Sequence, residues 1–276
     1  MAKFLSIGIL LLLSAPIAAQ TQITLYSDHP LDIKLTQETL NSNVLNALEM
    51  HADGDIHFLY QLVPLNRSWL MLEKSPSCLI NQIKTPEREA KAYFSRFPMN
   101  LYPPLRLIVP DAKTVSWPDE FTPAEFNLAG QNMIGLVKGR SYGSELDGIF
   151  AKTPQYYYIR GGTEPAERII DMLIAKRITA TIDYSRSVRS YLNDTDGLFE
   201  FKAIPIAGQT VPVAGYIACS KDNQGKAMIK AIDSVFAEDA MLQDYLQFHR
   251  EYFGEQEASL LEPFIREYHR QLIELE

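Results

Sequence analysis

The chain has 276 residues, of which 46% are hydrophobic, and it carries 26 lysines and arginines against 34 aspartates and glutamates. The net charge of -8 argues against nucleic acid and anionic lipid surfaces as partners, because both attract basic proteins. A chain of this length can bury one large core or two small ones.

The first 20 residues, 1–20, predict a cleavable secretory signal peptide. Lys3 supplies the positive charge, Leu5 to Leu13 form a short apolar stretch, and the small residues Ala18 and Ala19 fit a cut near residue 19 or 20. An uncleaved N-terminal anchor is the alternative. No cysteine follows the cut to carry a lipid, and no later apolar run approaches the roughly 18–20 residues of a spanning helix. The mature chain is therefore expected in the periplasm, with no stable membrane insertion after cleavage.

Short β-rich runs alternate with helical stretches, which predicts an α/β architecture. Strands are expected at residues 23–26, 56–63, 78–80, 105–109, 134–137, 156–159, 178–182, 201–206 and 215–219. Helices are expected at residues 38–50, 68–73, 144–152, 165–177 and 226–237. The C-terminal part from residue 239 is also helical, with Gly254 as a break and Pro263 at the start of the last helix.

Two proline-containing stretches, residues 111–123 and 206–212, have the composition of connections between lobes. If both are crossings, the residues between them form an inserted second lobe. The sequence therefore predicts a first lobe from residues 21–112 plus 210–276 and a second lobe from residues 113–209.

The two cysteines, Cys78 and Cys219, lie in apolar, strand-like surroundings. In an oxidising compartment such a pair favours a disulfide. Two buried free thiols are the alternative, because a sequence does not show whether the two Cα atoms come within about 7 Å of each other.

Three spaced fragments carry a family resemblance: Lys84–Arg88 with Phe94–Pro98, then Ile134–Gly143, then Met172–Tyr184. With the order of the elements, they resemble the family 3 extracellular solute-binding proteins, the periplasmic receptors of polar amino-acid ABC importers. The resemblance implies an α/β type II periplasmic-binding-protein fold, with two lobes joined by two crossings. It also implies a monomer without a cofactor, which captures a small anionic or zwitterionic, amino-acid-like solute by hinge closure.

The first two fragments supply candidate binding residues. The resemblance places Arg88 where the family clamps the ligand carboxylate, and a guanidinium can meet a carboxylate with two parallel N–H groups. A surface arginine paired with Glu87 or Glu89 is the alternative. Ser141 and Tyr142 precede a helix, where main-chain N–H groups and the helix dipole can hold an anion. These donors can also serve as a plain helix cap.

The third fragment departs from the family. Tyr184 stands where amino-acid receptors have the acid that holds the ligand ammonium, and Asp183 lies one residue earlier. On a strand, Asp183 would point to the opposite face unless the strand end shifts by one residue. Tyr26 and Tyr184 are expected to line the apolar part of the site. Arg67 is either a second anion contact or a solvated charge at a helix start.

The sequence contains no recognisable catalytic constellation. Its five histidines are scattered, and it has neither a cysteine cluster nor a zinc-binding motif. A dehydratase-like enzyme on the same scaffold would need an acid in the cleft, such as Asp28 or Asp183. The resemblance implies a binding protein that serves an ABC permease, and the lack of such a constellation disfavours an enzyme. A sensory or accessory receptor for a membrane partner is the alternative, and an enzyme is the less favoured one.

Overall fold

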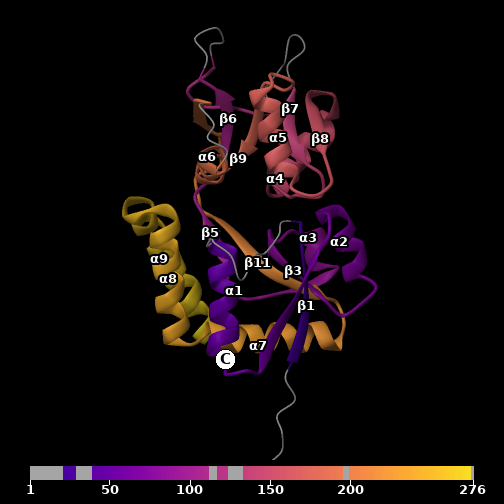
Figure 1. Cartoon of the computed structure of the whole chain (residues 1–276), viewed down its shortest axis with the longest axis vertical. Coiled ribbons are helices and arrows are strands. Elements are labelled where there is room, and N and C mark those ends of the chain that lie inside the picture. Colours follow the sequence, from indigo (N-terminus) through magenta and orange to yellow (C-terminus); the bar gives the residue numbers. More distant parts are fainter. Residues whose placement is uncertain (1–20, 29–38, 112–116, 124–132, 195–198, 275–276) are drawn as a thin grey trace, which may run out of the picture.

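The chain forms two α/β lobes, one above the other (Figure 1). This structure is a computed structural model, and it describes residues 21–28, 39–111, 117–123, 133–194 and 199–274. The predicted signal peptide, residues 1–20, lies outside the described residues. None of the helices within the described ranges is long and apolar enough to cross a membrane.

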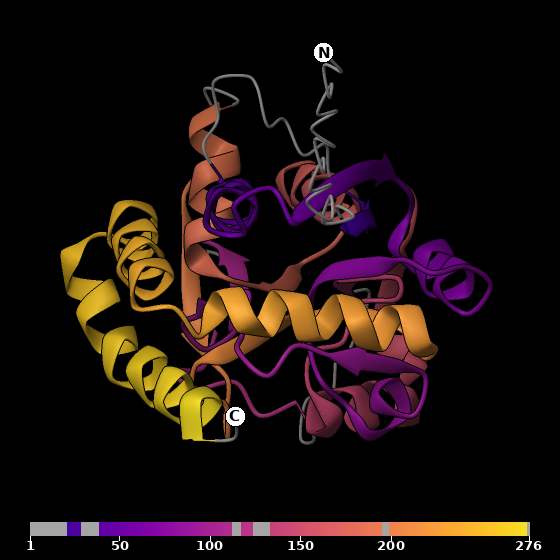
Figure 2. The ribbon, with the colours of Figure 1, turned by 90° about the horizontal axis from the view of Figure 1, so that it is seen from below.

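The first lobe contains a six-stranded sheet in the order β2-β1-β3-β11-β4, with β5 paired to β11. Its strands are β1 (Thr21–Ser27), β2 (Ile56–Leu62), β3 (Cys78–Gln82), β4 (Ala92–Phe94), β5 (Asn100–Tyr102) and β11 (Val213–Ser220). Its helices are α1 (Leu40–His51), α2 (Leu65–Leu72), α3 (Pro86–Glu89), α7 (Asn223–Phe236), α8 (Asp239–Phe253) and α9 (Glu255–Glu274). Helix α7 runs across the sheet, and α8 and α9 pack as a pair beside α1 (Figures 1 and 2).

The second lobe contains a five-stranded sheet in the order β10-β6-β9-β7-β8. Its strands are β6 (Arg106–Pro110), β7 (Ile134–Val137), β8 (Tyr157–Arg160), β9 (Ala180–Asp183) and β10 (Phe201–Pro205). Its helices are α4 (Ser144–Lys152), the short 3-10 helix η1 (Pro154–Tyr156), α5 (Pro165–Ile174) and α6 (Ser185–Asp194). Each lobe has its own buried apolar clusters, so each sheet is a separate scaffold for the surface between the lobes.

Local sequence signals explain several element ends. Thr39 caps α1, because its hydroxyl accepts the Ser42 N–H at 3.2 Å. Pro165 occupies the first turn of α5, where an N–H would have no helical partner. Gly254 ends α8 with a φ of 82°, a left-handed conformation that glycine adopts without strain.

The predicted strands are all confirmed, but the three-residue strands β4 and β5 were not expected. The prediction that Pro263 begins the last helix is wrong, because Pro263 lies inside α9. The buried residues of α9 continue at helical spacing on both sides of the proline: Ala258, Leu261, Ile265, His269 and Leu272. Packing of this stripe against the first lobe therefore outweighs the backbone hydrogen bond that proline cannot make.

The first crossing differs from its predicted position. Strand β6 pairs with β10 and β9 in the second sheet, so the chain leaves the first lobe at residues 103–105 and not after residue 112. Phe121, in the predicted connection, is buried in the second lobe and bridges to Ile206. A short apolar run fits either sheet equally well, and Pro103 and Pro104 are the local signal of the true crossing. The predicted second boundary, at residues 209 and 210, lies between β10 and β11.

The two cysteines face each other on neighbouring strands of the first sheet. Cys78 of β3 and Cys219 of β11 are directly opposite in the antiparallel register. Their Cα atoms are 4.0 Å apart, their sulfurs are bonded, and both side chains are fully buried. The bond therefore ties an early strand to the strand that returns from the second lobe.

Strand β5 forms half of the link between the lobes, since it pairs with the start of β11. His249 of α8 holds this strand in place. Its Nε2 accepts the main-chain N–H of Leu101 at 3.2 Å, and its Nδ1 lies 2.8 Å from the carbonyl oxygen of Tyr245. Accepting at Nε2 requires a neutral ring with its proton on Nδ1. Burial lowers the pKa of His249 to about 4, which keeps the ring neutral.

Candidate ligand-binding cleft

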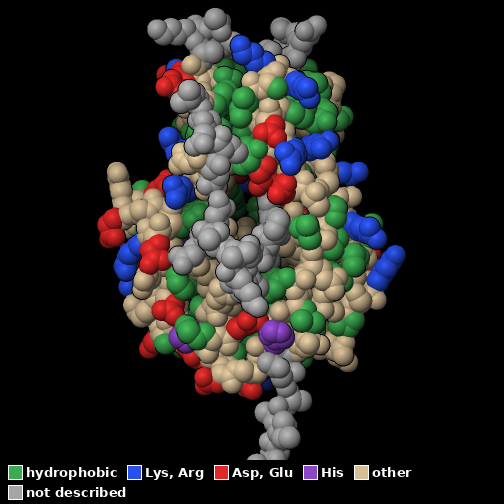
Figure 3. Space-filling view, in the orientation of Figure 1, with side chains coloured by type: hydrophobic (Ala, Val, Ile, Leu, Met, Phe, Trp, Pro, Cys, Tyr) green, Lys and Arg blue, Asp and Glu red, His purple; other side chains and the backbone are tan. Residues whose placement is uncertain are grey.

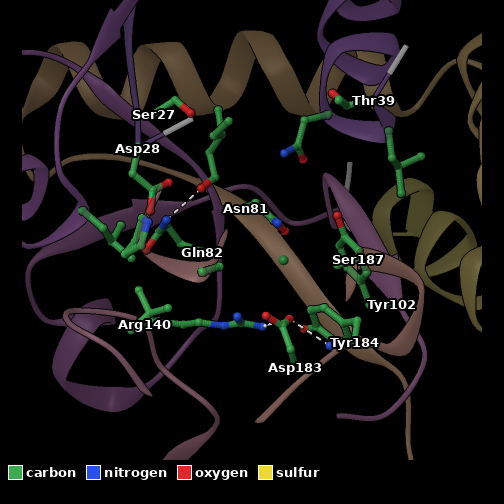
Figure 4. A pocket seen from close by; sticks show the side chains of 18 of the residues that line it. Ser27, Asp28, Thr39, Asn81, Gln82, Tyr102, Arg140, Asp183, Tyr184 and Ser187 are labelled. Carbon is green, nitrogen blue, oxygen red and sulfur yellow. Dashed lines mark hydrogen bonds and ion pairs between the residues drawn. The ribbon is translucent and has the colours of Figure 1, made fainter. Parts of the chain in front are cut away.

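A cleft of about 680 Å³ lies between the two lobes. Figure 3 shows a hollow at this level of the molecule, with Asp and Glu side chains close to it. Residues of both lobes line the cleft, among them Arg88 and Asn81 from the first lobe and Arg140, Ser141, Asp183 and Tyr184 from the second. Figure 4 labels Asn81, Arg140, Asp183 and Tyr184 in this cleft. Its volume is in the range of small-molecule sites.

Arg88 reaches from the first lobe to the second. Its Nη1 donates to the carbonyl of Ile83 at 3.2 Å, and its Nη2 donates across the cleft to the carbonyl of Gly139 at 2.7 Å. The guanidinium also lies over the Trp69 ring, 4.9 Å from its centre. Burial lowers the pKa of Arg88 to about 10, and the charge of Asp147 partly offsets this shift. Among the described residues, no carboxylate forms an ion pair with Arg88.

The sequence predicts that donors at Ser141 and Tyr142 bind the ligand, but in the structure these donors bond to Asp147. Asp147, in the first turn of α4, accepts the Ser141 hydroxyl at 2.5 Å and the Tyr142 N–H at 2.9 Å. The Tyr142 side chain is buried, and its hydroxyl accepts the Val137 N–H at 2.9 Å. Tyr142 is therefore a packing residue, and Asp147 takes the donors that were expected to bind a ligand. Ser141 still lines the cleft.

Asp183 lines the cleft, and its counter-ion is Arg140 of the same lobe. Its Oδ1 accepts from Nη2 of Arg140 at 3.0 Å and from the Tyr184 N–H at 2.8 Å (Figure 4). Burial by itself lowers the pKa of Arg140, but the adjacent Asp183 carboxylate raises it above its ordinary value. The strand end thus turns Asp183 toward the cleft, and Arg140 is a cleft residue that the sequence reasoning missed.

Tyr184 joins the two lobes through aromatic contacts. Its ring stacks on Tyr102 of β5, with the centroids 4.4 Å apart and the planes 19° from parallel. Tyr102 in turn meets Tyr252 and Phe253 of α8 edge to face. Burial raises the pKa of Tyr184, so its hydroxyl stays protonated at neutral pH. The main-chain N–H of Glu164 also donates across the lobes to the carbonyl of Asp28 at 3.3 Å. Through these contacts the two lobes touch each other beside the cleft.

Two predicted binding residues lie elsewhere. Tyr26 is buried in an apolar cluster of the first lobe and does not line the cleft. Arg67 is exposed on α2 and does not line it either. The resemblance suggests both residues by their place in the chain, Tyr26 on the first strand and Arg67 at a helix start. The direction of a side chain also depends on strand register and helix rotation, which the place in the chain does not give.

Asn81 is a second cleft residue that the sequence reasoning missed. A register shift between β3 and β11 leaves Asn81 in a bulge with a φ of 55°, which is rare for a residue with a side chain. A Cβ built on Gly215 would lie 1.8 Å from the Asn81 Oδ1, so the glycine leaves the room that this carboxamide occupies. Gly215 in a strand was the signal in the sequence that could have pointed to this close contact.

We expect the substitutions Gly215→Ala and Asn81→Gly to be strongly coupled in stability. Gly215→Ala alone should cost about 1–3 kcal/mol, because the new methyl group displaces the Asn81 side chain. In the Asn81→Gly background the same change should cost clearly less, since the clashing oxygen is gone. Urea unfolding of the four proteins measures the coupling. Lys176→Gly, at an exposed position with a φ of 57°, is the control for glycine at positive φ. Additive effects would contradict this placement of Asn81.

Within the described ranges, no group of three His, Cys, Asp or Glu side chains could hold a metal ion. No family model matches the chain, and neither does any curated protein.

Several solved structures share the architecture. One comes from a study of glutathione import via GshT and the cystine ABC importer TcyBC of Streptococcus mutans; it is 17% identical, with 86% of this chain and 96% of that chain covered and a TM-score of 0.63. A putative L-cystine ABC transporter protein from Listeria monocytogenes is 16% identical, with coverages of 87% and 98% and a TM-score of 0.63. The arginine-, lysine-, histidine-binding protein ArtJ from Geobacillus stearothermophilus is 16% identical, with coverages of 86% and 96% and a TM-score of 0.61. The chain therefore has the two-lobed type II periplasmic-binding-protein fold.

Proposed function

We propose that the protein is a periplasmic solute-binding protein that captures a small anionic or zwitterionic, amino-acid-like solute for an ABC importer. The observation that carries the proposal is Arg88. It is a cation in a cleft between two lobes, it contacts both lobes, and no carboxylate pairs with it among the described residues. Withdrawing a charge from water without a counter-ion is costly, so an anionic ligand group would complete the site.

Hinge closure supplies the receptor mechanism. The lobes are linked at residues 103–105 and 206–212, next to the paired strands β5 and β11. A ligand that binds Arg88 on one lobe and polar groups on the other is bound more tightly when the lobes are together. It therefore shifts the population toward the closed form, which a membrane permease would recognise. Of the solved structures of this fold described above, one concerns glutathione import and a cystine ABC importer, one is a putative L-cystine ABC transporter protein, and one is an arginine-, lysine-, histidine-binding protein, which supports the choice of partner.

A binding screen tests the proposal. The purified protein is titrated by calorimetry with the twenty L-amino acids, their deaminated carboxylic acids, L-cystine and glutathione. We expect at least one of these compounds to bind stoichiometrically without being converted. Arg88→Ala should then weaken its binding about 10- to 100-fold, the range for a charge-assisted pair in a partly buried site.

Arg67→Ala is the matched control, because it removes an arginine of the same lobe that is exposed outside the cleft. It should leave the affinity unchanged. If Arg88→Ala leaves the affinity unchanged as well, or if the wild-type protein binds none of the compounds, the proposal is wrong. Conversion of a bound compound into a product would favour an enzyme on the same scaffold.

A further inference from the structure

The floor of the cleft carries an ion pair that belongs to the protein itself. Arg140 and Asp183 both line the cleft, and they meet at 3.0 Å (Figure 4). The Asp183 side chain is 8% exposed and that of Arg140 is 19% exposed, so water weakens their attraction little. The Asp183 carboxylate therefore has its counter-ion before any ligand arrives.

Aromatic rings hold Arg140 in this position. Its guanidinium lies 5.1 Å from the centre of the Tyr142 ring and 5.4 Å from the centre of the Tyr184 ring. Tyr142 is buried, and Tyr184 is stacked on Tyr102, so neither ring is free to move away. The main-chain N–H of Tyr184 adds a further donor to the same carboxylate oxygen. A ligand cation could reach Asp183 only by displacing the Arg140 guanidinium, which Tyr142, Tyr184 and Asp183 hold in place.

An α-amino acid brings its ammonium within one carbon of its carboxylate. Arg88, which would hold the carboxylate, donates to the carbonyl of Gly139, the residue next to Arg140. In the second lobe the Asp183 carboxylate already has Arg140 as its counter-ion, so the ammonium would give up water without gaining a counter-ion from this pair. Displacing Arg140 instead would leave its charge buried without a partner.

We infer that Arg140 is a built-in counter-ion that occupies Asp183, so that the cleft selects carboxylic acids without an α-ammonium over α-amino acids. The inference rests on the proposed function, since it assumes that Arg88 binds the ligand carboxylate. Three other carboxylates line the cleft: Asp28 at the end of β1, and Glu164 and Glu167 at the start of α5. Asp28 is at the edge where β1 meets α5, well separated from Asp183 in Figure 4, and Glu164 at that edge pairs with Arg168 at 3.3 Å. Only an ammonium adjacent to the carboxylate is disfavoured, not a cationic group farther along the ligand.

Matched pairs of compounds test the inference on the wild-type protein. Each pair is an L-amino acid and the acid with the same side chain and hydrogen in place of the ammonium. In every pair that binds, the deaminated acid should bind at least about tenfold more tightly. Tighter binding of the amino acid overturns the inference and leaves the proposed function standing. Failure of both members in all pairs, together with cystine and glutathione, overturns the proposed function and the inference with it.

Variants then identify the residue responsible. Arg140→Gln uncovers Asp183 and should shift the preference at least tenfold toward the amino acid. The double variant Arg140→Gln with Asp183→Asn should lose that gain, because the acceptor carboxylate is gone. Arg160→Gln, an exposed arginine of the same lobe, is the control and should not change the preference. An equal shift in Arg160→Gln, or no shift in a folded Arg140→Gln protein, contradicts the role of Arg140. Thermal melts show which variants are folded, and the wild-type comparison does not depend on them.

Discussion

Replacing Cys78 and Cys219 together with alanine should lower the free energy of unfolding by about 3–5 kcal/mol. The bond closes a loop with a sequence separation of 141, so it removes many conformations from the unfolded chain. Alanine is preferred to serine because both positions are fully buried, where a hydroxyl would lack a partner. For a chain of this size the melting temperature should fall by about 10 °C.

The single variants provide the control for the disulfide. Cys78→Ala or Cys219→Ala alone already breaks the bond, so each should cost nearly as much as the double variant. This non-additivity separates loss of the bond from loss of two small buried side chains. Melting curves of the wild-type and the three variants measure it. Additive losses, or a double variant as stable as the wild-type, would show that the bond contributes little to stability.

Acid should destabilise the protein through His249, and this is the second large effect. Its pKa is about 4 in the folded chain and about 6.5 in an unfolded one, so the unfolded state binds the proton first as the pH falls. This contribution is fully present above pH 6.5 and is lost toward pH 4. Between pH 7 and pH 5 the loss amounts to about 2 kcal/mol. Its main cause is burial of the ring, which disfavours the charged form, and a protonated Nε2 also could not accept the Leu101 N–H.

Asp233 changes the stability in the opposite direction as the pH falls, and variants of Asp233 and His249 test the two contributions. Burial raises its pKa from 3.8 to about 6, so between those values the folded state binds the proton first and gains stability as the pH falls. Asp233→Asn should therefore lose stability more steeply than the wild-type between pH 7 and pH 5. His249→Gln should be less stable than the wild-type at pH 7, with a gap that narrows by about 2 kcal/mol at pH 5. Urea unfolding at the two pH values measures both, and parallel pH profiles would rule out this role of His249.

Local structure in this chain was predictable because its signals are local. The apolar runs of the strands, Gly254 after α8 and Pro165 in the first turn of α5 act over a few residues, and all lie where they were expected. Strands β4 and β5 were missed because three residues are too few to show the alternation of apolar and polar residues that marks a strand. Pro263 was misread because the packing of α9 decided against a local rule.

The candidate site was predictable in part. Arg88, Ser141, Asp183 and Tyr184 line one cleft, although they come from two lobes. Tyr26 and Arg67 do not line it, because register and helix rotation decide where a side chain points. The partners of the cleft residues were not predictable at all: Asp147 for the Tyr142 N–H, Arg140 for Asp183, and Gly215 beside Asn81.

By itself, then, the sequence determined the α/β alternation, the position of most elements and the presence of two cysteines in strand-like surroundings. These properties follow from periodicity and from the conformational limits of glycine and proline. Only the tertiary structure decided that β6 belongs to the second sheet, that Cys78 lies opposite Cys219, and that Asp183 is paired with Arg140. The reason is that strand pairing and charge pairing join residues far apart in the chain, and their choice depends on packing energies that no local pattern records.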